Sequence, residues 1–181
     1  MFKRVFILVF SLFVMQGTVL FAQYDLNHFL FSGRQLLIDG KYSQAMENFT
    51  ILSRLDSTCY EAYFLRGIAK YNLGDFSGAL TDFDRCIHFN PLHTLSYHYR
   101  GIAYSQLGNF DMALKDIQEA IDLRPNYYNL YLSRGITYFL SRQFDKAVLD
   151  FNRYIRRVPD DGEVYIDRGA CFVFMGELGN S

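Results

Sequence analysis

The sequence is poor in several residue types, and each shortage argues against a class of protein. Three scattered cysteines in 181 residues provide neither a disulfide framework nor a zinc knuckle. Basic and acidic side chains number 18 and 19, so the positive excess of a nucleic-acid-binding domain is missing. Tryptophan is absent, yet 18 Phe and 14 Tyr bring the aromatic content to 18%. These rings must build an aromatic-rich core or cover a sticky surface.

The first 22 residues differ from the rest of the chain. Lys3 and Arg4 precede an apolar run over residues 5–14, and the segment ends at the small residue Ala22. This order is typical of a secretory signal peptide, so we predict cleavage after Ala22 and export to the periplasm or cell envelope. The alternative is an uncleaved N-terminal membrane anchor, since residues 5–22 could just span a thin bilayer. No later stretch resembles a membrane span.

The remainder, residues 23–181, repeats with a period of 34 residues. We divide it into units 26–59, 60–93, 94–127, 128–161 and a partial unit 162–181, and number positions within each unit. Position 8 is always glycine: Gly33, Gly67, Gly101, Gly135 and Gly169. Position 20 is alanine in every complete unit: Ala45, Ala79, Ala113 and Ala147. Position 32 holds all three prolines of the chain, Pro91, Pro125 and Pro159.

The spacing within a unit predicts two helices. Positions 4, 8 and 11 fall on one stripe of a first helix, and positions 20, 24 and 27 fall on one stripe of a second. Glycine and alanine let the two helices approach closely, and aromatic side chains fill the space around them. Position 18 predicts the N-cap of the second helix: Ser43, Ser77, Asp111 and Asp145. The prolines are expected to end that helix.

Aromatic residues at 4, 11, 17 and 24, with Gly at 8, Ala at 20 and Pro at 32, make these units resemble the tetratricopeptide repeat, although Lys70 replaces an apolar residue at position 11. The resemblance covers residues 26–181 and implies an all-α fold, a right-handed superhelical solenoid of helix-turn-helix units. With the predicted export signal, the chain is similar to secreted or envelope tetratricopeptide proteins of bacteria. It also implies a non-enzymatic scaffold for protein–protein interaction.

Two positions change together within this one sequence. Position 7 is Arg and position 23 is Asp in the second, third and fourth units. The first unit has Ser32 and Asn48 there instead. We therefore predict that Arg66, Arg100 and Arg134 each pair with an aspartate, Asp82, Asp116 and Asp150, across the two helices. The alternative is independent drift between copies of the repeat.

In the tetratricopeptide family, positions 2, 5, 9, 12 and 13 of the first helix line the concave face. The resemblance implies a partner-binding groove made of Leu30, Arg34, Phe64, Ile68, Tyr71, Asn72, His98, Ile102, Leu132, Ile136, Phe139 and Ile166. Only Arg34 and Asn72 resemble the set that grips a carboxylate in some members, so a C-terminal carboxylate is not the expected ligand. We expect an apolar or aromatic segment or an amphipathic helix. The alternative is that neighbouring units shield part of this stripe.

The sequence offers little for catalysis. His88, His93 and His98 are five residues apart, which does not place them on one helical face as a two-histidine metal site requires. No cysteine is paired with a base in the sequence, and no phosphate-binding loop or hydrolase motif is present. We predict no enzyme activity, no metal and no cofactor.

The fifth unit reaches only position 20, at Ser181. Its first helix carries the apolar run 172–175, and repeat arrays usually end in a polar capping helix. We expect either that the natural chain continues or that this helix associates with itself or a partner. The second functional interpretation follows from this: a regulatory or substrate-docking portion of a larger envelope enzyme or assembly.

Overall fold

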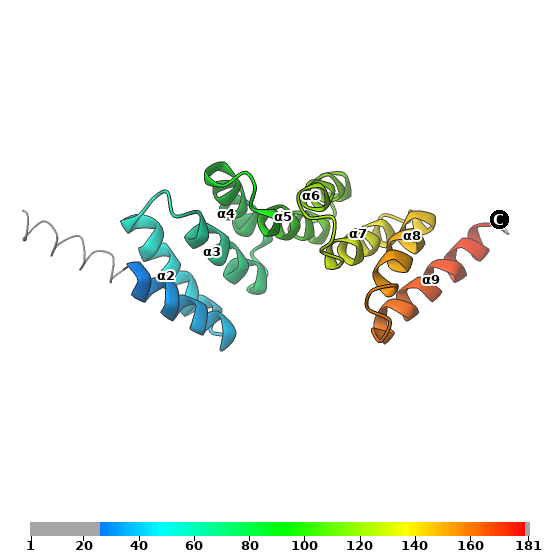
Figure 1. Cartoon of the computed structure of the whole chain (residues 1–181), viewed down its shortest axis with the longest axis horizontal. Coiled ribbons are helices and arrows are strands. Elements are labelled where there is room, and N and C mark those ends of the chain that lie inside the picture. Colours follow the sequence, from blue (N-terminus) through cyan, green and yellow to red (C-terminus); the bar gives the residue numbers. More distant parts are fainter. Residues whose placement is uncertain (1–25, 180–181) are drawn as a thin grey trace, which may run out of the picture.

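The computed structural model describes residues 26–179, and the predicted signal peptide with its cleavage site lies outside that range. Residues 26–38 are helical, and the following helices are α2 (Tyr42–Leu55), α3 (Tyr60–Asn72), α4 (Phe76–Phe89), α5 (Thr94–Gln106), α6 (Phe110–Leu123), α7 (Asn129–Leu140), α8 (Phe144–Ile155) and α9 (Gly162–Gly179). No strand occurs within residues 26–179. The helices follow one another in chain order along the long axis of the molecule (Figure 1). The predicted all-α repeat solenoid is confirmed.

The pattern of helix contacts gives the solenoid its curvature. Each helix packs against the next, and the first helices of successive units also touch: α3 contacts α5, α5 contacts α7, and α7 contacts α9. The second helices α4, α6 and α8 make no such contacts with one another. First helices therefore lie closer together than second helices, which places them on the inner, concave side.

Within a unit, the ring or side chain at position 24 packs onto the glycine at position 8. A Cβ atom added to Gly33, Gly67, Gly101 or Gly135 would lie 2.5, 2.6, 2.7 or 2.8 Å from the nearest atom of Phe49, Phe83, Ile117 or Phe151, respectively. The four alanines at position 20 are fully buried beside this contact. Only a residue without a side chain allows such a close approach of the two helices.

The predicted N-caps are wrong by two residues. The second helices begin at Tyr42, Phe76, Phe110 and Phe144, and their capping residues are Lys41, Asp75, Asn109 and Gln143. Ser43, Ser77, Asp111 and Asp145 instead lie in the first helical turn, where Asp111 and Asp145 face the positive end of the helix dipole. The turn is set earlier, by a residue with positive φ at position 15: Gly40, Gly74, Gly108 and Arg142.

The helices α4 and α6 end two residues before Pro91 and Pro125, and α8 ends four residues before Pro159. The residue before each of the first two prolines, Asn90 and Arg124, leaves the helical region. The prolines thus stand in the loops between units.

Candidate protein-binding surface

The predicted Arg–Asp pairs are present in all three units. Nε and Nη2 of Arg100 donate to the two carboxylate oxygens of Asp116 at 2.6 and 2.7 Å. Arg66 binds Asp82 at 2.9 and 2.6 Å, and Arg134 binds Asp150 at 2.6 and 2.7 Å, in the same two-pronged geometry. In the first unit, Asn48 donates to Ser32 at 3.1 Å, so a neutral hydrogen bond replaces the ion pair. Drift alone does not account for this joint change.

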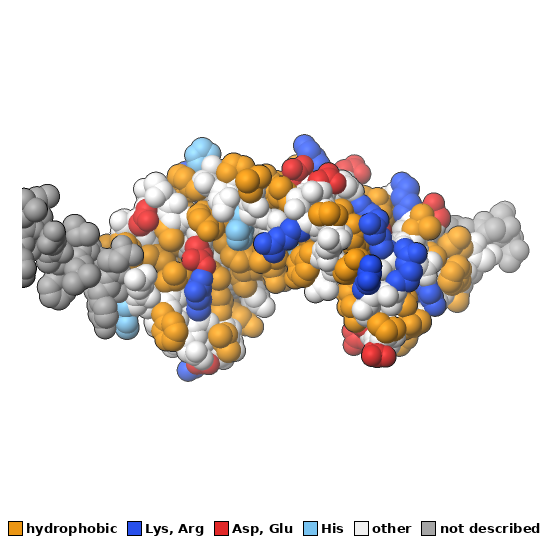
Figure 2. Space-filling model, in the orientation of Figure 1, with side chains coloured by type: hydrophobic (Ala, Val, Ile, Leu, Met, Phe, Trp, Pro, Cys, Tyr) orange, Lys and Arg blue, Asp and Glu red, His pale blue; other side chains and the backbone are white. Residues whose placement is uncertain are grey.

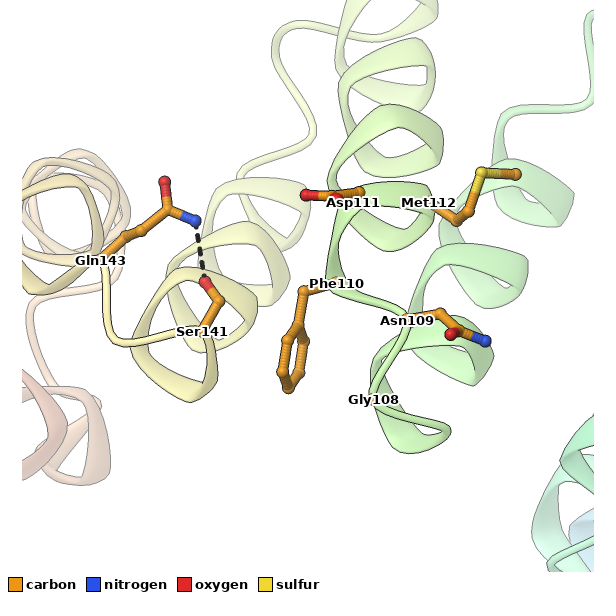
Figure 3. Close-up of a pocket in the computed structure, with 7 residues that line it drawn as sticks. All are labelled: Gly108, Asn109, Phe110, Asp111, Met112, Ser141 and Gln143. Carbon is orange, nitrogen blue, oxygen red and sulfur yellow. Dashed lines mark hydrogen bonds between the residues drawn. The ribbon is translucent and has the colours of Figure 1, made fainter.

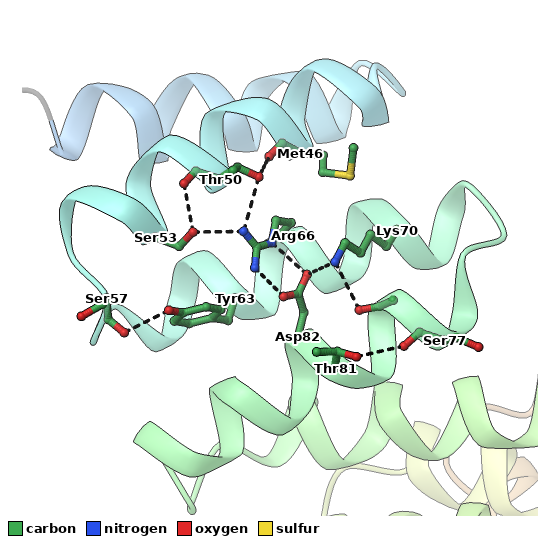
Figure 4. Close-up of polar contacts among 11 residues, drawn as sticks. Met46, Thr50, Ser53, Ser57, Tyr63, Arg66, Lys70, Ser77, Thr81 and Asp82 are labelled. Carbon is green, nitrogen blue, oxygen red and sulfur yellow. Dashed lines mark hydrogen bonds and ion pairs between the residues drawn. The ribbon is translucent and has the colours of Figure 1, made fainter.

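A third contact of these arginines was missed in the sequence. Nη1 of each arginine reaches back to position 25 of the preceding unit. The acceptors are Thr50, Asp84, Gln118 and, for Arg168, Asn152. Figure 4 shows this arrangement for Arg66, which lies between Asp82 on one side and Thr50 and Ser53 on the other. The signal that could have revealed it is a polar residue at position 25 in every complete unit.

Burial acts to lower the pKa of Arg100, but its hydrogen bonds to Asp116 and Asp84 outweigh this effect, so the pKa is raised. For Arg66 and Arg134 the hydrogen bonds to Asp82 and Asp150 are the largest effect and raise the pKa. Each guanidinium also lies 5.5 Å from the ring centroid of the tyrosine at position 4. These charged groups fix one helix pair onto the next.

Lys70 stands where the family pattern has an apolar or aromatic residue. Its ammonium lies 2.9 Å from Asp82 Oδ2 and donates to the carbonyl of Gly78 at 3.3 Å. Asp82 is therefore shared between two cations, and the substitution at position 11 extends the network of Figure 4.

The groove residues predicted from the sequence differ widely in exposure. Four are exposed: Arg34, Asn72, Ile136 and Ile166. Seven are half-buried: Leu30, Phe64, Ile68, Tyr71, Ile102, Leu132 and Phe139. The rings among the half-buried residues pack against neighbours: Phe64 lies 4.7 Å from His93, and Phe139 lies 5.9 Å from Phe174, between ring centroids. The concave stripe is therefore partly core and partly surface.

His98 does not line an open groove as expected, because it is only 7% exposed. Its Nε2 is 2.8 Å from Oγ of Ser133 on α7, and its ring contacts Tyr99 and Tyr127. Nδ1 is buried without a hydrogen-bond partner, and burial lowers the pKa of His98 to about 4. The close approach of α5 and α7 covers this side chain.

The two residues that resembled a carboxylate clamp are engaged within the chain. Arg34 forms an ion pair with Glu61, and Asn72 donates to the carbonyl of Ile68 at 2.8 Å. Both side chains would have to exchange these partners for a ligand. The arrangement therefore gives no support to a preformed carboxylate site in this stripe.

Two pockets away from this stripe are formed by turns. One, of about 470 Å³, lies between the turn before α6 and the turn before α8 (Figure 3). Its lining has a single charged side chain, Asp111, and Gln143 donates to Ser141 at 3.0 Å across its edge. The other, of about 400 Å³, follows the loop 123–127. Neither contains a residue of the predicted groove.

One cysteine has a nearby base, contrary to expectation. Sγ of Cys86 lies 3.6 Å from Nδ1 of His93, which is 2.8 Å from Oγ of Ser96. Cys86 is fully buried, and burial raises the pKa of its thiol to about 11. Burial also lowers the pKa of His93. Because an activated cysteine needs a lowered thiol pKa, this contact is a packing feature of the α4–α5 loop.

The helix α9 exposes several apolar side chains. Ile166, Phe172 and Val173 are 73%, 55% and 60% exposed. At Gly169 an added Cβ would meet nothing within 4 Å, unlike the other glycines at position 8. One face of α9 packs on α8 and α7, and the other is open among the described residues.

Within residues 26–179 there is no group of three or more His, Cys, Asp or Glu side chains that could hold a metal ion. In the same part of the chain, no helix has the length and apolar character needed to cross a membrane.

Stacked helix pairs, a concave side of first helices and a close contact between the glycine at position 8 and the side chain at position 24 in each complete unit define an α-solenoid of helix-turn-helix repeats. Family models described as tetratricopeptide repeat match residues 61–93 and 95–127. The second and third units of the chain are therefore tetratricopeptide repeats.

Solved structures share this fold at low sequence identity. A MamA double mutant is 21% identical with a TM-score of 0.75, over 82% of this chain and 84% of its own. MamA from Desulfovibrio magneticus is 17% identical with a TM-score of 0.72, over 86% and 94%. A tetratricopeptide repeat protein from Parabacteroides merdae is 22% identical with a TM-score of 0.73, and this chain spans 60% of its length. No curated protein sequence matches the chain.

Proposed function

We propose that this chain is a non-enzymatic scaffold that binds a protein or peptide segment on its concave side. The observation that carries the proposal is the contact pattern, in which first helices touch one another and second helices do not. It creates an inner surface on which apolar side chains remain accessible, above all Ile136 and Ile166. A ligand can bury these side chains and the exposed edges of Ile68 and Ile102 together.

The chemistry of this surface favours an apolar ligand. Arg34 and Asn72 are held by Glu61 and by the backbone of α3, so the accessible groups are mostly aliphatic. An amphipathic helix or an extended segment with apolar side chains at alternate positions matches such a surface. A ligand held mainly by its terminal carboxylate does not.

The proposal includes export to the cell envelope, with residues 1–22 as the signal peptide. Its support is the charged start, apolar middle and small final residue of that segment. Expression of the full chain in a bacterium and mass determination of the envelope fraction test it. A mature protein starting at Gln23 is the expected result, whereas a full-length, membrane-bound product would favour the anchor.

The binding surface is tested by a variant that leaves the core alone. Ile136→Asp with Ile166→Asp places two charges on exposed positions of α7 and α9. Leu149→Asp is the matched control, because Leu149 is 68% exposed on the second helix α8. Crosslinked capture from envelope fractions should yield a partner with wild type and control, and lose it with the double variant.

If wild type and the double variant retain the same partners, the concave surface is not the binding site. The second candidate function then gains: a docking portion of a larger envelope assembly or enzyme, joined through α9. The specific observation behind it is the exposed apolar stretch with Phe172 and Val173. Self-association through this stretch predicts that Phe172→Asp converts an oligomer into a monomer in sedimentation experiments.

A further inference from the structure

A third pocket lies at the outer edge of the fourth unit. It has a volume of about 550 Å³ and is lined by Tyr128, Arg153, Arg156 and Arg157. Figure 2 shows Lys and Arg side chains gathered over the α7–α8 end of the molecule and few of them over α3 and α4. The arginines come from the last turn of α8 and the residues that follow it.

Two of these arginines are held in place by aromatic rings. The guanidinium of Arg153 lies 4.2 Å from the ring centroid of Tyr131, and that of Arg157 lies 5.1 Å from the ring centroid of Tyr128. Stacking against a ring fixes the plane of a guanidinium and leaves its N–H edges free to donate. The pocket is therefore lined by oriented donors.

None of the three arginines forms an ion pair with a carboxylate among the described residues. The arginines at position 7 behave differently, since Arg66, Arg100 and Arg134 each donate two hydrogen bonds to an aspartate. The three arginines of the pocket are thus left without a carboxylate partner among the described residues. Three like charges repel one another, and an anion between them would relieve the repulsion.

The repeat itself shows that the fold does not need arginine here. The cluster occupies positions 26, 29 and 30 of its unit. The same positions hold Ile51, Arg54 and Leu55 in the first unit, Arg85, His88 and Phe89 in the second, and Glu119, Asp122 and Leu123 in the third. The C-terminus of a helix favours a cation in its last turn, which explains one arginine at the end of α8. The other three units fold in the same way without arginine at all three positions.

We propose that this pocket binds an acidic peptide segment, through carboxylate side chains that enter between the guanidinium groups. The ligand class rests on the proposed function, which is protein binding. The site lies at the C-terminal end of α8 and next to the start of α7, and none of its lining residues belongs to the predicted groove. Planar guanidinium groups match carboxylates in two-pronged geometry. The pocket is lined by three guanidinium groups, so a segment with several acidic residues matches it.

A bilayer with anionic headgroups is the other ligand that a basic cluster attracts. The surroundings favour the peptide. Asp160 and Glu163 are exposed and follow Arg157 by three and six residues, so acidic side chains border the basic cluster in the sequence and the positive charge is confined to a short segment. Single side chains of a peptide can enter the pocket.

The test uses fluorescein-labelled hexaglutamate as the probe and fluorescence anisotropy as the readout, at about 0.15 M salt, where exposed charges are screened. The pocket variant is Arg153→Gln with Arg156→Gln and Arg157→Gln. We expect saturable binding by wild type and at least about tenfold weaker binding by the variant. Phosphatidylglycerol vesicles form a second arm, and they should bind more weakly than hexaglutamate.

The control removes the same charge elsewhere: Arg54→Gln, Arg85→Gln and Lys115→Gln. All three side chains are exposed, and Arg85 occupies the position in its unit that Arg153 occupies in the fourth. The control should bind hexaglutamate within about twofold of wild type, since general attraction by net charge contributes little at this salt. Circular dichroism melting curves should coincide for both variants.

Three outcomes would overturn the proposal: no saturable binding by wild type, equal loss in the control, or binding of the vesicles in place of hexaglutamate. The variant Ile136→Asp with Ile166→Asp separates this inference from the proposed function. It should retain hexaglutamate binding while losing its concave partner. If the pocket fails and that partner loss persists, only the acidic-peptide site is wrong.

Discussion

The helices α7 and α9 carry the same repeat residues in different surroundings. Gly135 of α7 receives Phe151, whereas Gly169 of α9 receives no side chain within 4 Å. Arg134 binds Asp150 of its own unit and Gln118 of the unit before. Among the described residues, Arg168 keeps the hydrogen bond to Asn152 of the unit before and lies 5.2 Å from the ring centroid of Tyr165, but it has no aspartate partner. A motif residue thus acquires its structural role from the second helix that packs on it.

The second helix also decides which side chains are buried and which remain on the surface. In the second to fourth units, the glycine, the aspartate and the residue at position 24 form one closed contact between two helices. In α9 the residues that would join such a contact remain accessible, together with Phe172 and Val173. Changes at equivalent positions should therefore have unequal, and in one case opposite, effects on stability.

The largest effect is expected from Asp150→Ala, which leaves Arg134 half-buried without its carboxylate. Removing one member of such a pair costs about 3 kcal/mol of unfolding free energy. Asn152→Ala removes the acceptor of Arg168 and should cost about 1 kcal/mol, since that bond is neutral on one side. Urea unfolding followed by circular dichroism measures both. Equal losses would show that the arginines in α7 and α9 are equivalent after all.

A double-mutant cycle isolates the pair itself. Arg100→Met and Asp116→Ala, singly and together, give the coupling between the two side chains. We expect a coupling of about 1–3 kcal/mol, because Asp116 is buried and the geometry is two-pronged. A coupling of zero would mean that each residue acts through packing alone.

The fold was predictable because the same residues recur at the same positions in several copies of the repeat. Glycine at 8, alanine at 20 and the joint change at 7 and 23 all have local, pairwise causes that a single unit contains. The N-caps were misplaced because a polar residue at position 18 also suits the exposed first turn of a helix. The residue with positive φ at 15 moves the start to the aromatic residue at 17.

The surface was harder to predict, because exposure depends on how one unit sits on the next. His98 is polar and occupies a groove position, yet the approach of α5 and α7 buries it. Cys86 and His93 meet because the loop after α4 folds back. The contacts of Arg66, Arg100 and Arg134 to the preceding unit join residues 16 apart in the sequence, a distance that no helical periodicity relates.

The pH effect of a buried histidine is expected in the middle of the solenoid, because His98 is buried there and α9 contains no histidine. His98 has a pKa of about 4 in the folded chain, against 6.5 without burial. Between these values the unfolded chain takes up a proton that the folded chain does not, so stability falls as the pH drops from 6.5 to 4. The expected loss is about 3 kcal/mol over that window.

The variant His98→Gln supplies the control for this effect, since its amide can still reach Ser133 without titrating. Urea unfolding at pH 7.5 and at pH 4.5 should give a smaller difference for the variant than for wild type. Burial lowers the pKa of His93 in the same direction, so the variant keeps part of the pH dependence. Identical pH dependence in both proteins would mean that His98 is accessible to water in solution.

The smallest effects, and the sharpest contrast, are expected from alanine at two glycines. In Gly135→Ala the new Cβ would lie 2.8 Å from the Phe151 ring, so strain of about 1–3 kcal/mol exceeds the gain of about 1 kcal/mol in helix propensity. In Gly169→Ala nothing lies within 4 Å, so only the gain remains and the chain should be more stable. Thermal unfolding of the two variants should shift in opposite directions. If Gly169→Ala instead lowers stability, a side chain must pack against Gly169 in solution. Sedimentation of the wild type then shows whether a second copy of the chain provides that side chain.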